Sequence, residues 1–152
     1  MKILDALHDE AIIIGLKASR KVEVIQELAT PVAELTGVDR ELLVRVLMER
    51  ERLGSTGIGG GIGIPHGKLK ELDAPVLAFG LSHQGVDFES MDGRPTYIFF
   101  LLLTPDDSAG LHLKLLASIS KLLKQEAIKE QLMKVKSTLD VIKIIKAAEV
   151  DI

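Results

Sequence analysis

The sequence predicts one α/β domain over residues 1–152, in which helices cover a central sheet of about five strands. Two observations lead to this prediction. Short runs of branched apolar residues, typical of buried strands, occur along the chain, and segments with helical spacing of apolar residues lie towards both ends. At 152 residues and 47% hydrophobic composition, the chain suits a single domain with a substantial core.

The first part of the chain predicts a strand followed by two helices. Residues 11–16 (AIIIGL) form a short β-branched run that predicts a buried strand. Ser19 is placed to cap a helix that Gly37 ends, and Asp39 is placed to cap the next. The apolar residues with helical spacing are Val22, Ile25, Leu28, Ala29 and Val32 in the first helix, and Leu42, Leu43, Val46 and Leu47 in the second.

A glycine-rich segment follows. Residues 54–67 read GSTGIGGGIGIPHG and contain seven of the thirteen glycines. A helix cannot persist there, because each glycine costs about 1 kcal/mol relative to alanine. Ile62 and Ile64 alternate with glycine, which predicts a short strand that runs into Pro65 and His66.

The remaining strands and helices complete the layered pattern. Residues 76–82 (VLAFGLS) predict a strand, residues 86–88 a weaker edge strand before a turn at Asp92-Gly93, and residues 97–103 (YIFFLLL) a central strand that is apolar on both faces. Three helices then close the chain. Their marker residues are Leu115, Leu116, Ile119, Leu122 and Leu123; then Ile128 and Leu132; and then Ser137 and Asp140 as a capping box before Val141, Ile142 and Ile145.

The composition excludes several classes of function. The 19 basic and 22 acidic residues give a net charge of −3, which argues against a nucleic-acid partner. The absence of cysteine excludes disulfides, thiol nucleophiles and cysteine-based metal sites. The longest apolar run, residues 97–103, is too short for a membrane span, and early acidic residues argue against a signal peptide. We therefore expect a cytoplasmic domain.

The glycine-rich segment does not match nucleotide-binding motifs. No glycine in it has partners at the second and fifth following positions, as a dinucleotide fingerprint requires. A phosphate-binding P-loop would need glycine at Ile62 and a hydroxyl residue at Leu69. Glycines still allow backbone N–H groups to approach an anion closely, so an anion-binding loop remains possible.

His66 is the first candidate for chemistry, because it lies between Pro65 and Gly67 at the end of this segment. An imidazole with one nitrogen held by a backbone carbonyl presents the other nitrogen as a neutral nucleophile. The alternative is a histidine whose hydrogen bonds are satisfied in a turn. Without an HExxH or GxSxG pattern, neither a zinc site nor a serine hydrolase is expected.

His112 and the arginines before the loop are further candidates. His112 shares the apolar face of its helix with Leu115 and Leu116 and lies in the first turn, where the positive helix end lowers the pKa of a histidine. The alternative is a satisfied core residue. Arg50 or Arg52 could reach an anion bound at the loop, the alternative being solvated helix ends.

Residues 50–69, RERLGSTGIGGGIGIPHGKL, closely resemble the active-site segment of IIA proteins of the bacterial phosphotransferase system. The similarity is to the fructose/mannitol superfamily, and particularly to its nitrogen-regulatory (IIA-Ntr) branch. It continues in residues 92–95 (DGRP), 99–105 (FFLLLTP) and 112–123 (HLKLLASISKLL). The resemblance implies a single α/β domain with a mixed sheet covered by helices. Gly60 departs from the branch, which often carries asparagine there.

The resemblance also implies the roles of individual residues. His66 matches the histidine that accepts a phosphoryl group on Nε2 from the phosphocarrier protein HPr, and so forms a phosphohistidine intermediate. His112 matches the second active-site histidine, and Arg50 the arginine beside the site. The family needs no metal or nucleotide cofactor. No segment resembles an attached IIB or IIC domain, so a stand-alone module is expected.

Three functions therefore remain as alternatives. The first is a regulatory phosphoryl carrier, whose partners are HPr and a downstream regulated protein. The second is a sugar-specific IIA protein that passes phosphate to a IIB component, and the third is a non-catalytic anion-sensing module. For a carrier we expect a partly apolar surface around His66, supplied by Ile58 and Ile62, with positive charge from Lys68 and Lys70.

Overall fold

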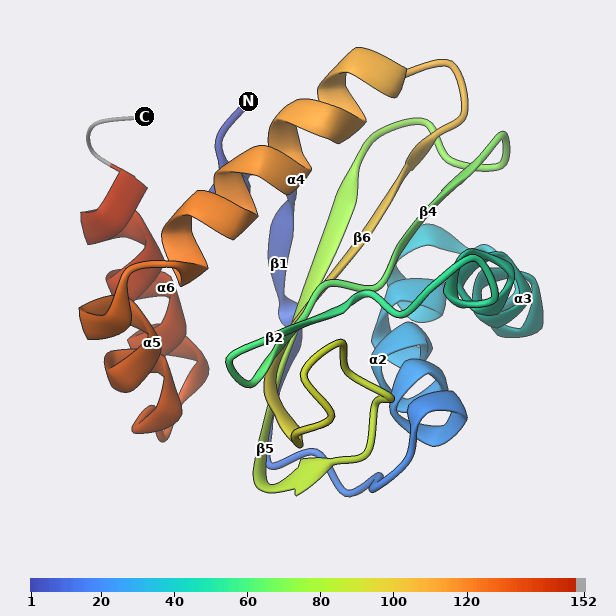
Figure 1. Ribbon diagram of the computed structural model, residues 1–152. Coiled ribbons are helices and arrows are strands. Elements are labelled where there is room, and N and C mark those ends of the chain that lie inside the picture. Colours follow the sequence, from blue (N-terminus) through green and yellow to red (C-terminus); the bar gives the residue numbers. More distant parts are fainter. Residues whose placement is uncertain (150–152) are drawn as a thin grey trace.

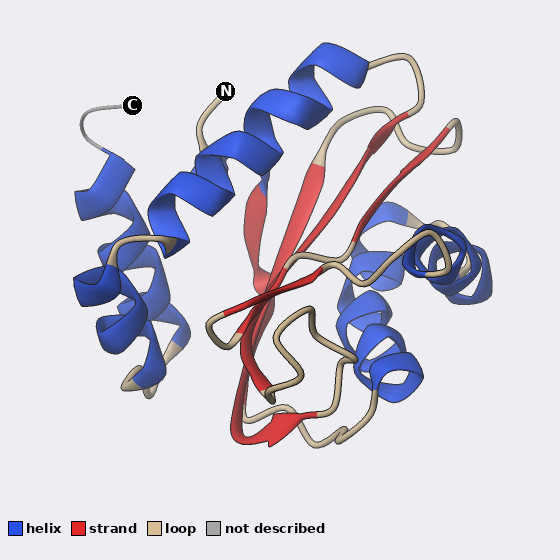
Figure 2. Ribbon diagram, in the orientation of Figure 1, coloured by secondary structure: helices blue, strands red, loops and turns tan. Residues whose placement is uncertain are grey.

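A mixed β-sheet lies between two layers of helices in the computed structural model, which describes residues 1–149 (Figures 1 and 2). Helices α2 (Lys21–Thr36) and α3 (Arg40–Glu51) cover one face. The other face carries α1 (Ile3–Ala6), α4 (Ala109–Leu123), α5 (Glu126–Met133) and α6 (Thr138–Ala148). The α/β prediction is confirmed.

Within the described residues, the sheet has six strands, one more than the approximate number predicted. The strand order is β1-β5-β6-β3-β2, and β4 pairs with β6 beside β3. The parallel pairs are β1 with β5, β3 with β6 and β4 with β6, whereas the other pairs are antiparallel. The strands are β1 (Leu7–Ile14), β2 (Gly57–Gly59), β3 (Ile62–Gly63), β4 (His66–Leu69), β5 (Val76–Val86) and β6 (Thr96–Pro105).

The central strand β6 joins the two halves of the core. Ile98, Phe100 and Leu102 belong to the apolar cluster under α4, α5 and α6. The alternate residues Phe99 and Leu101 belong to the cluster under α2 and α3. Because successive side chains of a strand point to opposite faces, a strand between two helical layers must be apolar throughout. This confirms the prediction for residues 97–103.

The pairing of β4 with β6 determines where the site forms. His66 lies opposite Leu102, and Lys68 lies opposite Thr104, so the end of the glycine-rich segment runs beside the end of β6. After Pro105 the chain turns and begins α4 at Ala109. His66 on β4, Thr104 on β6 and the first turns of α4 are therefore neighbours.

The predicted start of α2 is wrong. The helix begins at Lys21 after Arg20, without a side-chain cap, and the Ser19 carbonyl instead accepts a bond from the Asp87 N–H. Val22, predicted to be apolar core, is 44% exposed, and Lys21 is buried. Lys21 can be buried because it has a carboxylate partner, Glu51, in the interior. Hydrophobic periodicity does not reveal such a partner. The predicted end is confirmed, because Gly37 adopts a left-handed φ of 75°.

The separate edge strand predicted at residues 86–88 does not exist. Strand β5 continues to Val86, which pairs with Thr96. Phe88 is fully buried, and its ring packs edge-on against Phe99 at 5.2 Å between centroids. The turn at Asp92-Gly93 is confirmed by a positive φ of 70° at Gly93. The sequence did not predict α1, β2 or the strand character of β4.

The C-terminal helices follow the prediction closely. Ser137 caps α6 by accepting the Asp140 N–H at 3.2 Å, and the Asp140 carboxylate accepts the Lys136 N–H at 3.0 Å. Leu116 and Ile142 are half-buried rather than fully buried. Across residues 1–149, no helix combines the length and apolar character that crossing a membrane requires.

Candidate active site

His66 opens β4 directly after the glycine-rich loop. Its Nδ1 lies 2.7 Å from the carbonyl oxygen of Ile64. A carbonyl can only accept, so Nδ1 carries the proton and Nε2 keeps its lone pair. Burial is the largest effect and lowers the pKa of His66, and the charges of Arg50 and Lys68 lower it further, while the bond to Ile64 and the charge of Glu51 partly oppose this. The ring is thus neutral at pH 7, with an unprotonated Nε2.

His112 lies beside it, 5.4 Å away between ring centroids. It is 3% exposed and belongs to the buried face of α4, as its spacing predicts. Its pKa is lowered to about 4, chiefly by burial and then by the charges of His66 and Lys68. The predicted cause, an open positive helix end, is therefore not the main one. The backbone N–H of His112 is already bonded to the Ser108 carbonyl at 2.9 Å, so it is not one of the free N–H groups of the helix end.

Thr104 determines which nitrogen of His112 carries the proton. Its hydroxyl oxygen is buried and lies 2.6 Å from His112 Nδ1. Within residues 1–149, the Thr104 hydroxyl has no hydrogen-bond partner other than His112. If Nδ1 donated, the hydroxyl proton would be buried without an acceptor, which costs about 1–3 kcal/mol. The hydroxyl therefore donates to Nδ1, and His112 presents an Nε2–H donor.

Arg50 completes the group from the last turn of α3. Its Nη1 donates to the carbonyl oxygen of Gly54 at 2.9 Å, so the guanidinium is held against the start of the loop. It lines an open cleft of about 430 Å³ together with both histidines and Lys68. The structure thus brings together all three residues predicted for the site. Arg52 is exposed and does not line this cleft.

The apolar rim of the cleft differs from the prediction. Leu53 and Leu113 line it and are 84% and 65% exposed. Ile62, on β3, is buried in the core cluster under α4, α5 and α6, and Ile58 lies on β2 outside the cleft. The glycine-rich segment forms a hairpin of β2 and β3 that carries Ile58 away from His66. Lys68 lines the cleft as predicted, whereas Lys70 does not.

Sequence reasoning missed Thr104 and Glu51 near the site. Thr104 follows the apolar run of β6, one residue before the strand ends. A hydroxyl residue at that position was the only sign in the sequence that Thr104 has a polar partner. Glu51 looks like a solvated helix-end carboxylate in sequence, yet it is 7% exposed. In the part of the chain that the structure describes, no group of three histidine or acidic side chains could hold a metal ion.

An open cleft with two neutral imidazoles and a guanidinium is suited to receive a small anionic group. Residues 5–148 match the family described as "Phosphoenolpyruvate-dependent sugar phosphotransferase system, EIIA 2". The chain belongs to this family, which confirms the resemblance found in residues 50–69.

Individual relatives include both branches of the family. A nitrogen regulatory protein of Bradyrhizobium diazoefficiens is 44% identical over 132 residues, covering 87% of this chain and 86% of that protein. A fructose-specific EIIABC component of Bacillus subtilis is 36% identical over 146 residues, which is 95% of this chain and 23% of that protein.

Solved structures share the fold. The crystal structure of IIA-Ntr from Neisseria meningitidis has a TM-score of 0.88 and 30% identity, and covers 93% of this chain and 97% of its own. The IIA mannitol protein of Escherichia coli has a TM-score of 0.76 and 22% identity, with 91% and 97% covered. This agreement confirms the predicted mixed sheet covered by helices.

Proposed function

We propose that the protein is a phosphoryl carrier that accepts a phosphoryl group from phospho-HPr on Nε2 of His66. One observation carries this proposal: the bond between His66 Nδ1 and the Ile64 carbonyl leaves Nε2 unprotonated on a residue that lines the open cleft. Family membership supports a role in phosphoryl transfer. Such a carrier acts in the cytoplasm and needs no cofactor.

The transfer balances without an added proton. The Nε2 lone pair of His66 attacks phosphorus, the nitrogen–phosphorus bond of the donor phosphohistidine breaks, and its electron pair returns to the donor ring. The His66 Nδ1 proton stays in place. The ring gains positive charge as the new bond forms, and the Ile64 carbonyl at 2.7 Å stabilises that charge.

Arg50 and His112 stabilise the transferred group. The phosphoryl oxygens carry negative charge during transfer, and catalysis of this kind depends on positioning and fixed donors. Arg50 uses Nη1 for Gly54, which leaves other guanidinium N–H groups for the oxygens. His112 donates through Nε2–H as a neutral group. Because His112 is neutral, it does not add a second positive charge beside His66, which would make the Nε2 lone pair less nucleophilic.

The regulatory branch is favoured for the downstream role. The 44% identical relative and the IIA-Ntr structure are both nitrogen regulatory proteins by name. The second candidate is a sugar-specific carrier that passes phosphate to a IIB component, supported by the fructose-specific relative at 36% identity. Transfer from the phosphorylated protein to a purified fructose IIB protein at transport rates would favour that candidate.

Partners distinguish the phosphorylated from the free form of His66 by its charge. A phosphoryl group adds about −1.5 to −2 charge, which reverses the local potential set by Arg50 and Lys68. Acidic partners that bind the free form through these residues are then repelled, while the backbone stays in place. Comparing backbone chemical shifts and partner affinity in the two forms tests this. A large rearrangement, or equal affinities, would contradict it.

Incubation with enzyme I, HPr and radiolabelled phosphoenolpyruvate tests the carrier function. The wild-type protein should become labelled and gain about 80 Da, the mass of one phosphoryl group. His66→Ala should remain unlabelled, and His83→Ala, which removes an exposed histidine of β5, should behave as wild type. Wild-type protein without a mass shift would support the anion-sensing module instead.

A further inference from the structure

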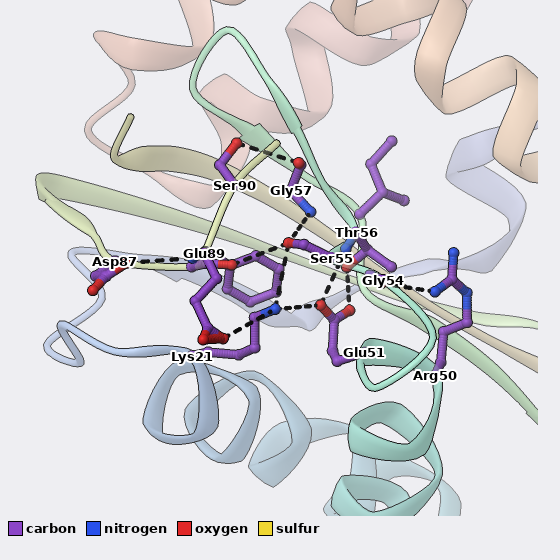
Figure 3. Close-up of polar contacts among 12 residues, drawn as sticks. Lys21, Arg50, Glu51, Gly54, Ser55, Thr56, Gly57, Asp87, Glu89 and Ser90 are labelled. Atoms are coloured by element: carbon purple, nitrogen blue, oxygen red, sulfur yellow. Dashed lines mark hydrogen bonds and ion pairs between the residues drawn. The ribbon is translucent and has the colours of Figure 1, made fainter. Parts of the chain in front are cut away.

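A buried ion pair lies behind the start of the glycine-rich loop (Figure 3). Lys21 Nζ on α2 is 2.9 Å from Glu51 Oε1 on α3, and the two side chains are 9% and 2% exposed. Removing two charges from water costs several kcal/mol per ion, and the attraction between them often only offsets that cost. Such a pair is a poor source of stability, so its other contacts indicate what it does.

Both members of the pair hold the loop. Glu51 accepts the backbone N–H of Thr56 at 3.1 Å and also the Thr56 hydroxyl. Lys21 donates to the Ser55 hydroxyl at 3.3 Å and lies 4.8 Å from the centre of the Phe88 ring. Figure 3 shows the bonds from Glu51 and Lys21 meeting at residues 55 and 56, and it also shows Lys21 beside Glu89, whose Oε2 lies 3.6 Å from Nζ. The loop therefore begins from a fixed point inside the molecule.

The hydrogen bonds continue from this point to the imidazole. The Thr56 carbonyl accepts the Ile64 N–H at 3.0 Å. The Ile64 carbonyl in turn accepts from His66 Nδ1 at 2.7 Å. Two hydrogen bonds, through Ile64, thus connect Thr56, which Glu51 holds, to the His66 ring.

Ile62 and Ile64 of the loop are buried in the core, but its tip supplies little packing of its own. Gly59, Gly60 and Gly61 all have positive φ values, of 95°, 65° and 81°. Glycines lose the most conformational freedom on ordering and bring no side chains to bury. Polar contacts from outside therefore fix these parts of the loop: Asp92 and Lys129 bond Gly60 at the tip, and Glu51 bonds Thr56 at the start.

We propose that Glu51, paired with Lys21, is a positioning residue for His66. It holds the peptide of Thr56, and thereby the Ile64 carbonyl that keeps the proton on Nδ1 and orients Nε2. Glu51 touches none of the reacting atoms. This inference rests on the proposed role of His66 as phosphoryl acceptor, but its structural part can be tested without a phosphoryl donor.

The test compares Glu51→Gln with Glu149→Gln in the full chain. Glu149 is also a buried carboxylate that accepts backbone N–H groups, but those belong to Ile3 and Leu4 on α1. Two measurements are made on each variant. The nitrogen-15 shifts of the His66 ring report its tautomer, and single-turnover labelling at saturating phospho-HPr reports transfer per folded molecule.

Glu51→Gln should shift His66 towards the Nε2–H tautomer and slow transfer by about 10- to 100-fold, because a displaced nucleophile loses its alignment. Glu149→Gln should leave both readouts at wild-type values. If Glu51→Gln does not fold, Thr56→Val keeps the ion pair, removes one contact to the carboxylate, and should shift the tautomer less. The proposal is overturned if folded Glu51→Gln keeps both the wild-type tautomer and the wild-type rate. If Glu51→Gln does not fold, a wild-type tautomer in Thr56→Val overturns it instead.

The two proposals fail in different ways. If wild-type protein is never labelled, the carrier function is wrong, but a tautomer shift confined to Glu51→Gln still supports the positioning role. If wild-type protein is labelled and Glu149→Gln changes the tautomer as much as Glu51→Gln does, the effect is a general loss of stability. That outcome would overturn the positioning role and leave the carrier function intact.

Discussion

Glu51 and Glu149 are two buried carboxylates that hold two regions of the molecule in different ways. Glu149, at the end of α6, accepts the N–H groups of Ile3 and Leu4 at 2.7 and 3.2 Å and so satisfies the first turn of α1. Glu51 has a buried cation, Lys21, as its partner and holds Thr56. Glu149 therefore joins the two ends of the described chain, and Glu51 anchors the start of the glycine-rich loop.

The difference shows what fixes the backbone in each region. Around Glu149, buried side chains such as Ile3 and Ile145 already determine how α1 and α6 pack, and the carboxylate satisfies the remaining N–H groups. In the loop, Ile62 and Ile64 are buried, but the three successive glycines at the tip offer no side chains to pack. Polar contacts then determine the geometry. Changes in the terminal region should therefore affect stability, and changes near the loop should affect transfer.

His112 should show the largest effect on transfer, because it lines the cleft beside His66 and supplies a donor to the transferred group. His112→Ala should slow phosphoryl transfer by about 100- to 1,000-fold, which corresponds to ~2.7–4 kcal/mol for one lost donor to the developing charge. The protein should still fold, because the apolar face of α4 remains buried. Single-turnover labelling and thermal unfolding measure both quantities. A variant that melts far lower but transfers normally would make His112 a core residue only.

Thr104→Val serves as the matched control for His112. It removes the hydroxyl that donates to His112 Nδ1 but leaves the imidazole in place. We expect slower transfer than in wild type and faster transfer than in His112→Ala.

Stability should fall on acidification because of the same histidine. The pKa of His112 is about 4 in the folded protein and near 6.5 when unfolded, so the unfolded state binds more protons between these values. The stability from keeping His112 neutral is present above pH 6.5 and is lost as pH falls towards 4. The shift corresponds to about 3 kcal/mol. Urea unfolding from pH 7.5 to 4.5 measures it, and an unchanged slope in His112→Gln would contradict this assignment.

Glu149→Ala should separate stability from transfer. It leaves the N–H groups of Ile3 and Leu4 without their acceptor, which should cost about 2–4 kcal/mol of unfolding free energy. Labelling per folded molecule should stay at the wild-type rate. Urea denaturation gives the first quantity and single-turnover labelling the second. Slower transfer in the folded variant would remove the distinction between the two regions.

Much of the fold could be predicted from the sequence because burial leaves periodic patterns. The apolar strand at residues 97–103 and the capping of α6 by Ser137 follow from such patterns and are confirmed. Lys21 and Phe88 could not be placed in this way. Lys21 is buried because Glu51, thirty residues later, is its partner. Phe88 lies beyond the end of β5 and is buried against Phe99 of β6, a contact between distant segments.

The site could be predicted in part. His66, His112 and Arg50 were candidates from their sequence context, and the family resemblance implied their roles. The spacing of His112 already placed it on the buried face of its helix. The apolar rim could not be predicted, because the β2–β3 hairpin directs Ile58 away from the cleft. Thr104 and Glu51 were missed because their importance depends on contacts between segments that are distant in sequence.

Gly67→Ala tests the packing of the loop region against α3. An added Cβ at this position would lie 2.6 Å from Val46 Cγ1, which cannot swing away because valine is branched at Cβ. We expect a loss of about 1–3 kcal/mol, typical of overpacking. Transfer should also slow, because β4 must move next to His66. Unfolding free energy and labelling rate check this, and wild-type values for both would contradict the tight fit.

Gly110→Ala is the counterpart in the helical layer and should have the smallest effect. Gly110 is exposed in the first turn of α4, has no positive φ, and has open space where a Cβ would lie. Alanine should stabilise the protein by about 0.4–1 kcal/mol, because it restricts the unfolded chain without straining the folded one. A rise of about 1–4 °C in Tm measures this gain. The labelling rate should stay unchanged although His112 is only two residues away, because the Thr104 hydroxyl and the buried face of α4 hold that ring. A slower rate would show that the first turn of α4, and not only the loop, controls the geometry of transfer.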